Sequence, residues 1–234
     1  MPSPDGDRRH LPAAPRPVRL DSGAIAVRPG PPRKLTEDEV LDAALSLLAE
    51  HGLDGLNVRA VAARLGASPG TLYNYFDSKQ TMVEAALARA LSPVILSIVR
   101  SGDWRADLRA TMVALHDALR ARPAAVSLVG AGVGAEAMDP IREHLLGSLA
   151  GAGLSTPDQL RALNMLVSLA VGDIVVLQAH TRDHRASELK RRRELPSDEF
   201  PHLREAAGIQ NEDPGDKTFL TGLDALLDAI VGIV

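Results

Sequence analysis

The chain has 234 residues, of which 45% are hydrophobic, and it carries a formal net charge of −4. It contains no cysteine, which excludes disulfides and thiolate metal sites. This length supports a helical core in one large or two small domains. The first thirty residues lack the apolar run of a signal peptide, and the longest apolar run, 163–177, is interrupted by Ser168 and Asp173. We therefore expect a soluble cytoplasmic protein that spans no membrane.

The first segment, 1–34, is rich in proline, arginine and glycine and shows no hydrophobic periodicity. We expect a disordered basic arm, because such a composition cannot bury a core. Seven basic residues against three acidic ones give the segment a charge of +4. An arm of this charge either binds the phosphates of a nucleic acid or is an inert extension, and the sequence leaves both interpretations open.

A helix is expected directly after this arm. Thr36 followed three residues later by Glu39 is a capping box, which predicts a helix start. Apolar residues recur at helical spacing as far as about His51, and Gly52 is a residue type that ends helices.

Two shorter helices follow, joined by a tight turn. Asn57 is a good N-cap for the first of them, and Gly66 tolerates the left-handed conformation that ends it. Ser68 is the next N-cap, and Pro69 suits the first helical position, where its missing N–H costs nothing. The second helix is expected to be about two turns long and carries four polar-tipped residues: Thr71, Tyr73, Asn74 and Tyr75.

Two short helices with a tight turn between them are typical of a helix-turn-helix, whose second helix enters the major groove of DNA. The alternative is a plain helical hairpin. A packing helix would not need two tyrosines, an asparagine and a threonine in a chain that is 3% aromatic. Their phenol, amide and hydroxyl groups can hydrogen-bond base edges and phosphates, so the composition favours the helix-turn-helix.

The residues 71–79 (TLYNYFDSK), preceded by 61–68 (VAARLGAS), closely resemble the DNA-binding domain of the tetracycline-repressor (TetR/AcrR) regulators. A weaker resemblance to the regulatory domain of the tetracycline repressors rests on Trp104, Leu108, 153–155, Gly172 and 219–224. The resemblance implies an all-α fold. A three-helix helix-turn-helix domain would occupy 35–91, and a ligand-binding and dimerisation domain would occupy 92–234.

The resemblance also implies a double-stranded DNA operator as partner. The candidate DNA contacts are Lys34, Asn57, Arg59, Ser68, Pro69, Gly70, Thr71, Tyr73, Asn74, Tyr75 and Lys79. The segment 35–91 holds eight acidic residues against four basic ones, a charge of −4. Positive charge for the phosphates is therefore expected from the arm, Arg59 and Lys79.

Beyond this segment the chain predicts helices and no strand. A helix is expected over about 79–100, where Pro93 can kink it. Further helices are expected at 103–122, 140–150, 157–180, 185–193 and 216–234, with a short apolar segment at 124–133 and a loop at 195–215.

Two C-terminal helices carry apolar stripes that we expect to pair with those of a second copy in a four-helix bundle, forming a homodimer. The stripe at 216–234 comprises Phe219, Leu220, Leu223, Leu226, Leu227, Ile230 and Val231. The stripe at 157–180 comprises Leu163, Leu166, Val167, Leu169, Ala170 and Ile174. The alternative is that these residues form the core of a single chain.

The resemblance further implies a cavity for a small-molecule effector. Its candidate residues are Met112, Leu115, His116, Leu119, Val126, Val129, Glu143, Asn164, Met165 and Ser168. Val129 and Val176 stand where tetracycline repressors need a histidine and a carboxylate for drug and magnesium, and valine cannot bind a hard cation. We therefore expect an apolar or amphipathic effector, with no metal and no cofactor.

Other patterns have ordinary explanations. His180 and His184 have metal-binding spacing but no suitable third ligand, which favours an exposed helix end. The basic run 190–193 is flanked by Glu188 and Glu194, which favours a solvated helix face. No catalytic motif or nucleotide-binding loop is present, so we expect no enzymatic activity.

The sequence therefore predicts a homodimeric DNA-binding transcriptional regulator, a repressor released from a palindromic operator by a small ligand. The alternative from another class is a ligand-binding or protein-interaction module that has lost DNA readout. The acidic helix-turn-helix segment is the feature that keeps this alternative open.

Overall fold

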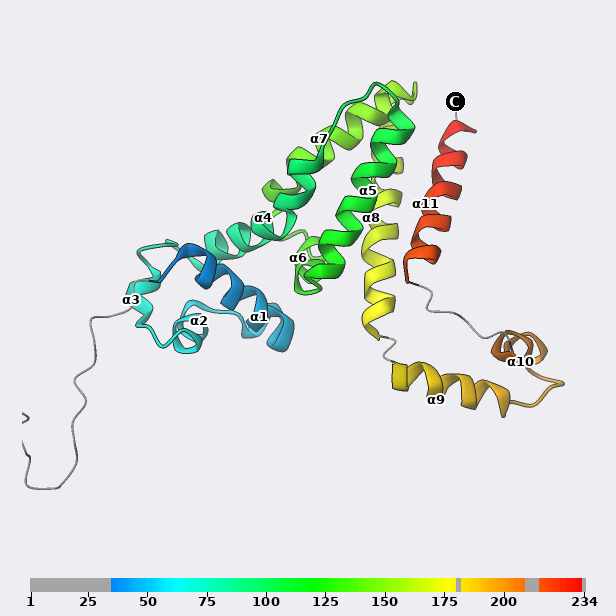
Figure 1. Cartoon of the computed structure of the whole chain (residues 1–234), viewed down its shortest axis with the longest axis horizontal. Helices are drawn as coiled ribbons and strands as arrows, with labels where there is room; N and C mark the ends of the chain where they lie inside the picture. The colour runs from blue at the N-terminus through cyan, green and yellow to red at the C-terminus, as the bar shows by residue number, and fades with distance from the viewer. Residues whose placement is uncertain (1–34, 180–181, 209–214, 233–234) are drawn as a thin grey trace, which may run out of the picture. The chain divides into compact units, whose positions relative to one another are not determined.

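The computed structural model describes residues 35–179, 182–208 and 215–232. Within these ranges the chain forms eleven helices and no strand, which confirms the expected all-α fold (Figure 1). Their bounds are α1 Glu37–Gly55, α2 Val58–Arg64, α3 Pro69–Leu72, α4 Lys79–Ser97, α5 Trp104–Ala121, α6 Ala124–Gly130, α7 Ala135–Gly151, α8 Thr156–Ala179, α9 Arg182–Arg193, α10 Pro201–Gly208 and α11 Gly215–Val231. The expected basic arm, 1–34, lies outside the described residues.

The capping box predicted at the start of α1 is present. The Glu39 backbone N–H donates to Thr36 Oγ1 over 3.2 Å, and the Thr36 backbone N–H donates to Glu39 Oε2 over 2.9 Å. Two of the four orphan donors at the helix start are thereby satisfied. Gly52, at a φ of 66°, leaves the helical conformation inside α1, so the regular helix ends where the sequence predicts.

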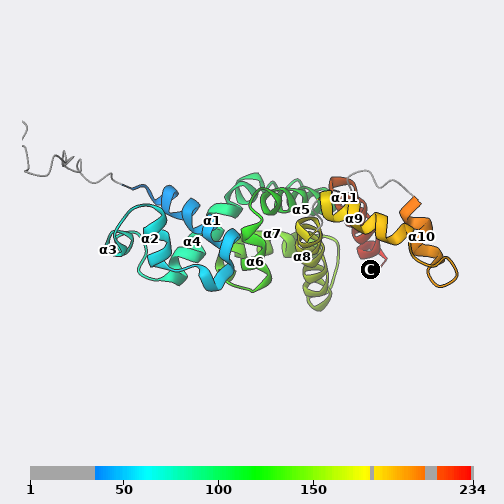
Figure 2. The ribbon, with the colours of Figure 1, turned by 90° about the horizontal axis from the view of Figure 1, so that it is seen from below.

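The N-terminal core forms where α1, α2, α3 and α4 face one another. Its buried side chains come from all four helices and their connections: Val40, Leu48, Leu56, Val61, Leu72, Phe76, Met82 and Val83. α4 also packs against α5, α6 and α7, and α1 against α6. Figure 2 shows α6 beside α1 from below. One helix, α4, therefore contributes to two cores. Pro93 lies within α4 without ending it.

The second core is built from α5 to α8, with α11 alongside (Figure 1). One face of α5 provides Leu108, Met112, Leu115 and Leu119, all fully buried. A polar junction lies at its edge. His116 Nε2 of α5 is 2.8 Å from Asp173 Oδ2 of α8, and the His116 ring stacks on Phe219 of α11 with centroids 3.9 Å apart. This junction fixes the relative position of three helices.

Two elements differ from the sequence-based expectation. α7 begins at Ala135 and not near Pro140, because Gly134 adopts a left-handed conformation that starts the helix five residues earlier. Helix α10 lies in the segment expected to be a loop. Pro201 begins that helix, and Arg193 Nε donates to Ala207 O over 3.0 Å to hold its end on α9.

The expected dimer stripes are largely intrachain core. On α11, Phe219, Leu223, Leu227 and Ile230 are buried, and on α8, Leu163, Leu166, Ala170 and Ile174 are buried. α11 packs on α5 and α8 of its own chain, so these apolar faces are covered within one chain. These eight residues therefore belong to the core of a single chain, which is the alternative to their lying in a dimer interface. The side chain of Val231 lies outside the described residues.

A different face of α8 remains apolar and exposed. Its large side chains are Leu160, Met165, Val175 and Val176, each about half exposed. Within the described residues, α8 is long and apolar enough to cross a membrane by length and composition alone. The expectation that Ser168 and Asp173 rule out such a segment was therefore too strict.

We predict that Asp173→Ala lowers the free energy of unfolding by about 1–3 kcal/mol, because it leaves the buried His116 without its hydrogen-bond partner. Urea denaturation at neutral pH measures this change. The matched control is Asp228→Ala, which removes an exposed carboxylate that pairs with Arg105 between α11 and α5. Its effect should be small, since exposed ion pairs contribute little. Equal effects of the two substitutions would contradict the role assigned to the junction.

Candidate nucleic-acid interface

The connection between α2 and α3 is fixed by local hydrogen bonds. Asn57 Oδ1 accepts from the Ala60 backbone N–H over 2.9 Å and begins α2. At the other end, the Ala67 N–H donates to Ala62 O and the Gly66 N–H donates to Ala63 O. This pair of bonds with a left-handed Gly66, at a φ of 63°, is a Schellman motif. A residue with a side chain at 66 would be strained.

Ser68 begins α3 as the sequence predicts. Its Oγ accepts from the Thr71 backbone N–H over 3.2 Å, and Pro69 occupies the first helical position. The regular helix is shorter than expected and ends at Leu72. Tight hydrogen bonds from Tyr75 N–H and Phe76 N–H to Leu72 O continue the turn. The buried Leu72 and Phe76 anchor this turn to the core, as their spacing predicts.

The candidate contacts of this region lie mostly at the surface. Tyr73 is 54% exposed, Asn74 is exposed, and Thr71 and Tyr75 are half-buried. Ser68, Pro69, Gly70 and Arg59 are also exposed. The candidates from 68 to 75 therefore lie on one short segment that Leu72 and Phe76 anchor to the core, and Asn57 and Arg59 lie at the start of α2. Lys34 lies outside the described residues.

Asn57 and Lys79 have structural partners in addition to their proposed role. The Asn57 side chain caps α2, and its Nδ2 also donates to Gly55 O over 3.3 Å. Lys79 Nζ donates to Leu53 O over 2.8 Å and is half-buried. An ammonium group has three donors, so this bond leaves Lys79 able to bind a phosphate. Contact of either residue with DNA stays a prediction.

Basic side chains in this region are mostly occupied by acidic ones. Arg64 binds Glu50 through both carboxylate oxygens, and the hydrogen bonds lower the pKa of Glu50. Arg89 pairs with Asp38 and Asp42. Among the basic side chains of 35–91, that of Arg59 alone makes no hydrogen bond or ion pair with another described residue. The cluster of acids thus neutralises Arg64 and Arg89 and leaves Arg59 for an external anion.

The candidate effector residues fall into two groups. Met112, Leu115, His116, Leu119 and Val126 are buried in the second core, and Val129 is half-buried on α6. Glu143, Asn164, Met165 and Ser168 are exposed. One chain therefore does not bring the whole set into a common cavity. Sequence reasoning missed Asp173 and Phe219 as partners of His116, although a lone aspartate in an apolar helix was a signal for the first.

No cluster of three or more histidine, aspartate or glutamate side chains that could hold a metal ion is present in the part of the chain that the structure describes. Val129 lies on α6, and Val176 lies 56% exposed on α8. His180 lies outside the described residues.

Two family models match the chain. "Bacterial regulatory proteins, tetR family" matches residues 40–86, and "Tetracyclin repressor-like, C-terminal domain" matches residues 99–233. The chain is 31% identical over 198 residues to the tetracycline repressor protein class D of Escherichia coli, covering 83% of this chain and 88% of that protein. It is 33% identical over 202 residues to the class A repressor from transposon 1721 of Escherichia coli. That match covers 84% of this chain and 91% of the repressor.

Solved structures share the fold. The TetR family protein ActR of Streptomyces coelicolor in complex with (S)-DNPA superposes with a TM-score of 0.67 at 20% identity, covering 86% of this chain and 99% of that one. A possible TetR family transcriptional regulator from Streptomyces coelicolor A3(2) also superposes with a TM-score of 0.67, at 25% identity. That match covers 85% of this chain and 100% of the other chain.

We predict that Asn74→Ala weakens binding to a specific DNA site by about 1–3 kcal/mol, because an asparagine amide pairs with an adenine edge. Binding to random DNA should change little. Fluorescence anisotropy with both DNAs measures the difference. Equal losses on the two would assign Asn74 to a backbone contact or to folding.

Arg59→Gln should weaken binding to every DNA sequence similarly and reduce the slope of log affinity against log salt by about one unit. Arg64→Gln is the matched control, since Glu50 already occupies that guanidinium. A salt series on the same DNA separates them. An unchanged slope for Arg59→Gln would show that its charge points away from DNA.

Proposed function

The chain belongs to the tetR family of bacterial regulatory proteins, and from this premise we propose that it is a repressor released from a palindromic operator by a small apolar or amphipathic ligand. Members of this family are DNA-binding transcriptional regulators and not enzymes. The proposal adds the operator symmetry, the ligand class and the homodimer to that family role. It also places the protein in the bacterial cytoplasm, where its DNA lies.

The observation that carries the proposal is the exposed polar surface of the segment that starts at α3. Tyr73 and Asn74 point away from a turn whose Leu72 and Phe76 are buried. The Schellman motif at Gly66 and the cap at Ser68 fix that turn before any partner arrives. A preorganised polar surface loses less conformational entropy when it binds a partner.

Coupling between ligand and DNA is supported by the contact between α4 and the start of α7. An added Cβ at Gly134 would lie 3.1 Å from Leu87 Cδ2 and 3.6 Å from Glu84 Cα, so the two backbones approach closely there. A ligand that moves α7 would press on α4 and shift α1 to α3. Moving such a switch from 1:99 to 99:1 takes a preference of about 5.5 kcal/mol.

The exposed apolar face of α8 supports a homodimer. Leu160, Met165, Val175 and Val176 lie on a helix that also provides core residues, and solvent is a poor environment for so apolar a surface. A second copy with the same face would cover it by two-fold symmetry. The hydrogen bond between Asp173 and His116 holds the opposite face of α8 against its own chain, so this apolar face is directed to solvent.

We predict that Val176→Asp converts the dimer to a monomer in sedimentation velocity at micromolar concentration, since it places a charge in an apolar interface. The matched control is Leu96→Asp on α4, where the native leucine is 86% exposed. That variant should remain dimeric. A dimeric Val176→Asp protein would place the interface on another surface.

The effector should act without a metal ion. The side chains of Val129 and Val176 offer no donor for a hard cation. We predict that a chelator leaves ligand-induced release intact and that tetracycline with magnesium does not release the protein from DNA. Release by the magnesium complex, followed by band shift, would contradict the assignment of these two valines.

The function itself is tested by a gel shift with DNA from immediately upstream of the protein's own gene. We expect a complex that survives excess random DNA and is lost to excess unlabelled upstream DNA. Equal competition by both DNAs would favour the module that has lost DNA readout.

A further inference from the structure

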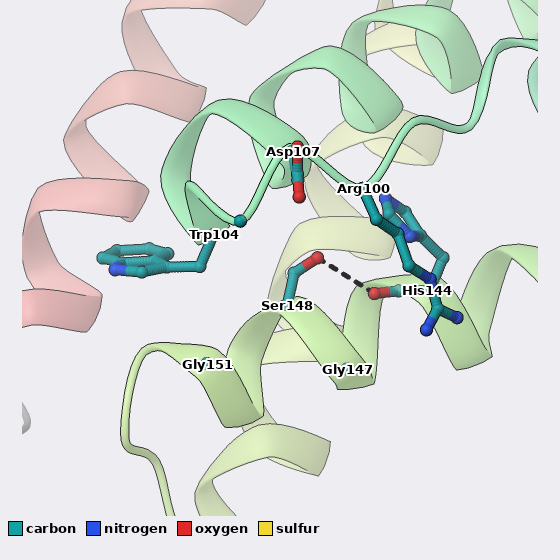
Figure 3. Close-up of a pocket in the computed structure, with 8 residues that line it drawn as sticks. Arg100, Trp104, Asp107, His144, Gly147, Ser148 and Gly151 are labelled. Atoms are coloured by element: carbon teal, nitrogen blue, oxygen red, sulfur yellow. Dashed lines mark hydrogen bonds between the residues drawn. The ribbon is translucent and has the colours of Figure 1, made fainter.

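A second feature lies at the start of α5, and none of its lining residues is a candidate DNA contact or an effector candidate. A hollow of about 200 Å³ opens where the connection between α4 and α5 meets α7 (Figure 3). Arg100, Trp104 and Asp107 line one side of it, and His144, Gly147 and Ser148 of α7 line the other. The proposed function does not use this hollow.

The hollow exists because one face of α7 has little side-chain bulk. Gly147 and Ser148 lie three and four residues after His144, and Gly151 lies four and three residues after them, so the four residues share that face. A Cβ added at Gly147 would meet no atom within 4 Å. Ser148 turns back on its own helix, where its Oγ donates to His144 O over 3.0 Å (Figure 3). This face therefore forms an open floor.

The acidic group of the hollow is already satisfied. Both carboxylate oxygens of Asp107 accept from the Ser101 backbone N–H over 3.1 Å, and Oδ1 also accepts from Ser101 Oγ over 2.6 Å. These hydrogen bonds lower the pKa of Asp107, which stays charged. Arg100, in contrast, is exposed and makes no hydrogen bond or ion pair with another described residue. The charge in the hollow without a partner is therefore positive.

The inner wall holds a polar atom that lacks a partner. His144 is 3% exposed, and its buried Nε2 makes no hydrogen bond within the described residues. Burial lowers the pKa of His144, the Asp107 carboxylate opposes that shift and Arg100 adds to it, so the net lowering favours the neutral ring. A buried polar atom without a partner costs free energy, which a bound polar group recovers.

We propose that this hollow binds a small planar carboxylate, an aromatic acid whose carboxylate pairs with Arg100 and whose ring lies over the floor formed by Gly147 and Gly151. A guanidinium is the cation best suited to a carboxylate, because it can bind both oxygens. Trp104 lines the hollow at its Gly151 end, and its indole extends away from Arg100 and His144 (Figure 3). The His144 side chain, which extends from α7 toward Arg100 (Figure 3), lies beside the bound acid group.

The test uses the intrinsic fluorescence of the full chain, because Trp104 is the single tryptophan. Benzoate is the probe, and benzyl alcohol is the neutral control with the same ring. We expect a saturable change with benzoate and at least about tenfold weaker binding of benzyl alcohol. Arg100→Gln, an exposed and conservative change, should weaken benzoate binding by about tenfold or more.

A matched pair at Gly147 tests the floor. Gly147→Leu fills the hollow and should abolish the benzoate response, while Gly147→Ala leaves most of the space and should preserve it. Both substitutions raise helix propensity in α7, so both proteins should fold, as a thermal melt will report. No saturable response, equal binding of the two probes, unchanged binding by Arg100→Gln, or full binding by Gly147→Leu would each overturn the proposal.

Discussion

The structure depends on α4 being shared by two hydrophobic cores. Its buried residues run the length of the helix, from Met82 to Val94, and it packs against α1 at one end of the molecule and against α5 and α7 further along. A capping box fixes its start, with the Thr81 N–H donating to Ser78 Oγ and the Ser78 N–H donating to Thr81 Oγ1, each over 3.1 Å. Because packed cores resist continuous deformation, any change in the second core that moves α4 must move α1 to α3 as a unit.

Electrostatics limits how the N-terminal helices can hold DNA. Arg64 and Arg89 are bound by acidic neighbours, and Lys79 donates to a backbone carbonyl, so we expect Arg59 to be the basic group of these helices that binds phosphate. The remaining positive charge of the N-terminal part lies in 1–34, outside the described residues. Such a charge distribution gives weak non-specific attraction, and under the proposed function base contacts from α3 would supply most of the binding energy of the described helices.

The local features of the fold were predictable from sequence because they depend on neighbouring residues. Asn57, Gly66 and Ser68 each act through hydrogen bonds within five residues, and all three do what their residue types predict. The polar surface at Tyr73 and Asn74 followed from the same reasoning. Helix α10 was missed because a proline that begins a helix looks like one that prevents it.

Long-range features could not be predicted in the same way. α8 is apolar on most of its surface, so periodicity alone does not choose the face that turns inward. The choice is made by Asp173, which pairs with a histidine 57 residues earlier in the chain, and by α11, which covers the neighbouring face. The hollow at Arg100 likewise could not be predicted from the sequence pattern. It forms where glycines of α7 face the loop between α4 and α5, which is far from them in the sequence.

In the proposed complex, two copies of this chain present two α3 segments to one DNA molecule. Hydroxyl-radical footprinting on the upstream DNA tests this arrangement most directly, because it reports each protected stretch of backbone. We expect two related stretches of protection whose centres lie about one helical turn apart, roughly 34–36 Å. A single protected half-site, or protection that ignores sequence, would contradict this arrangement.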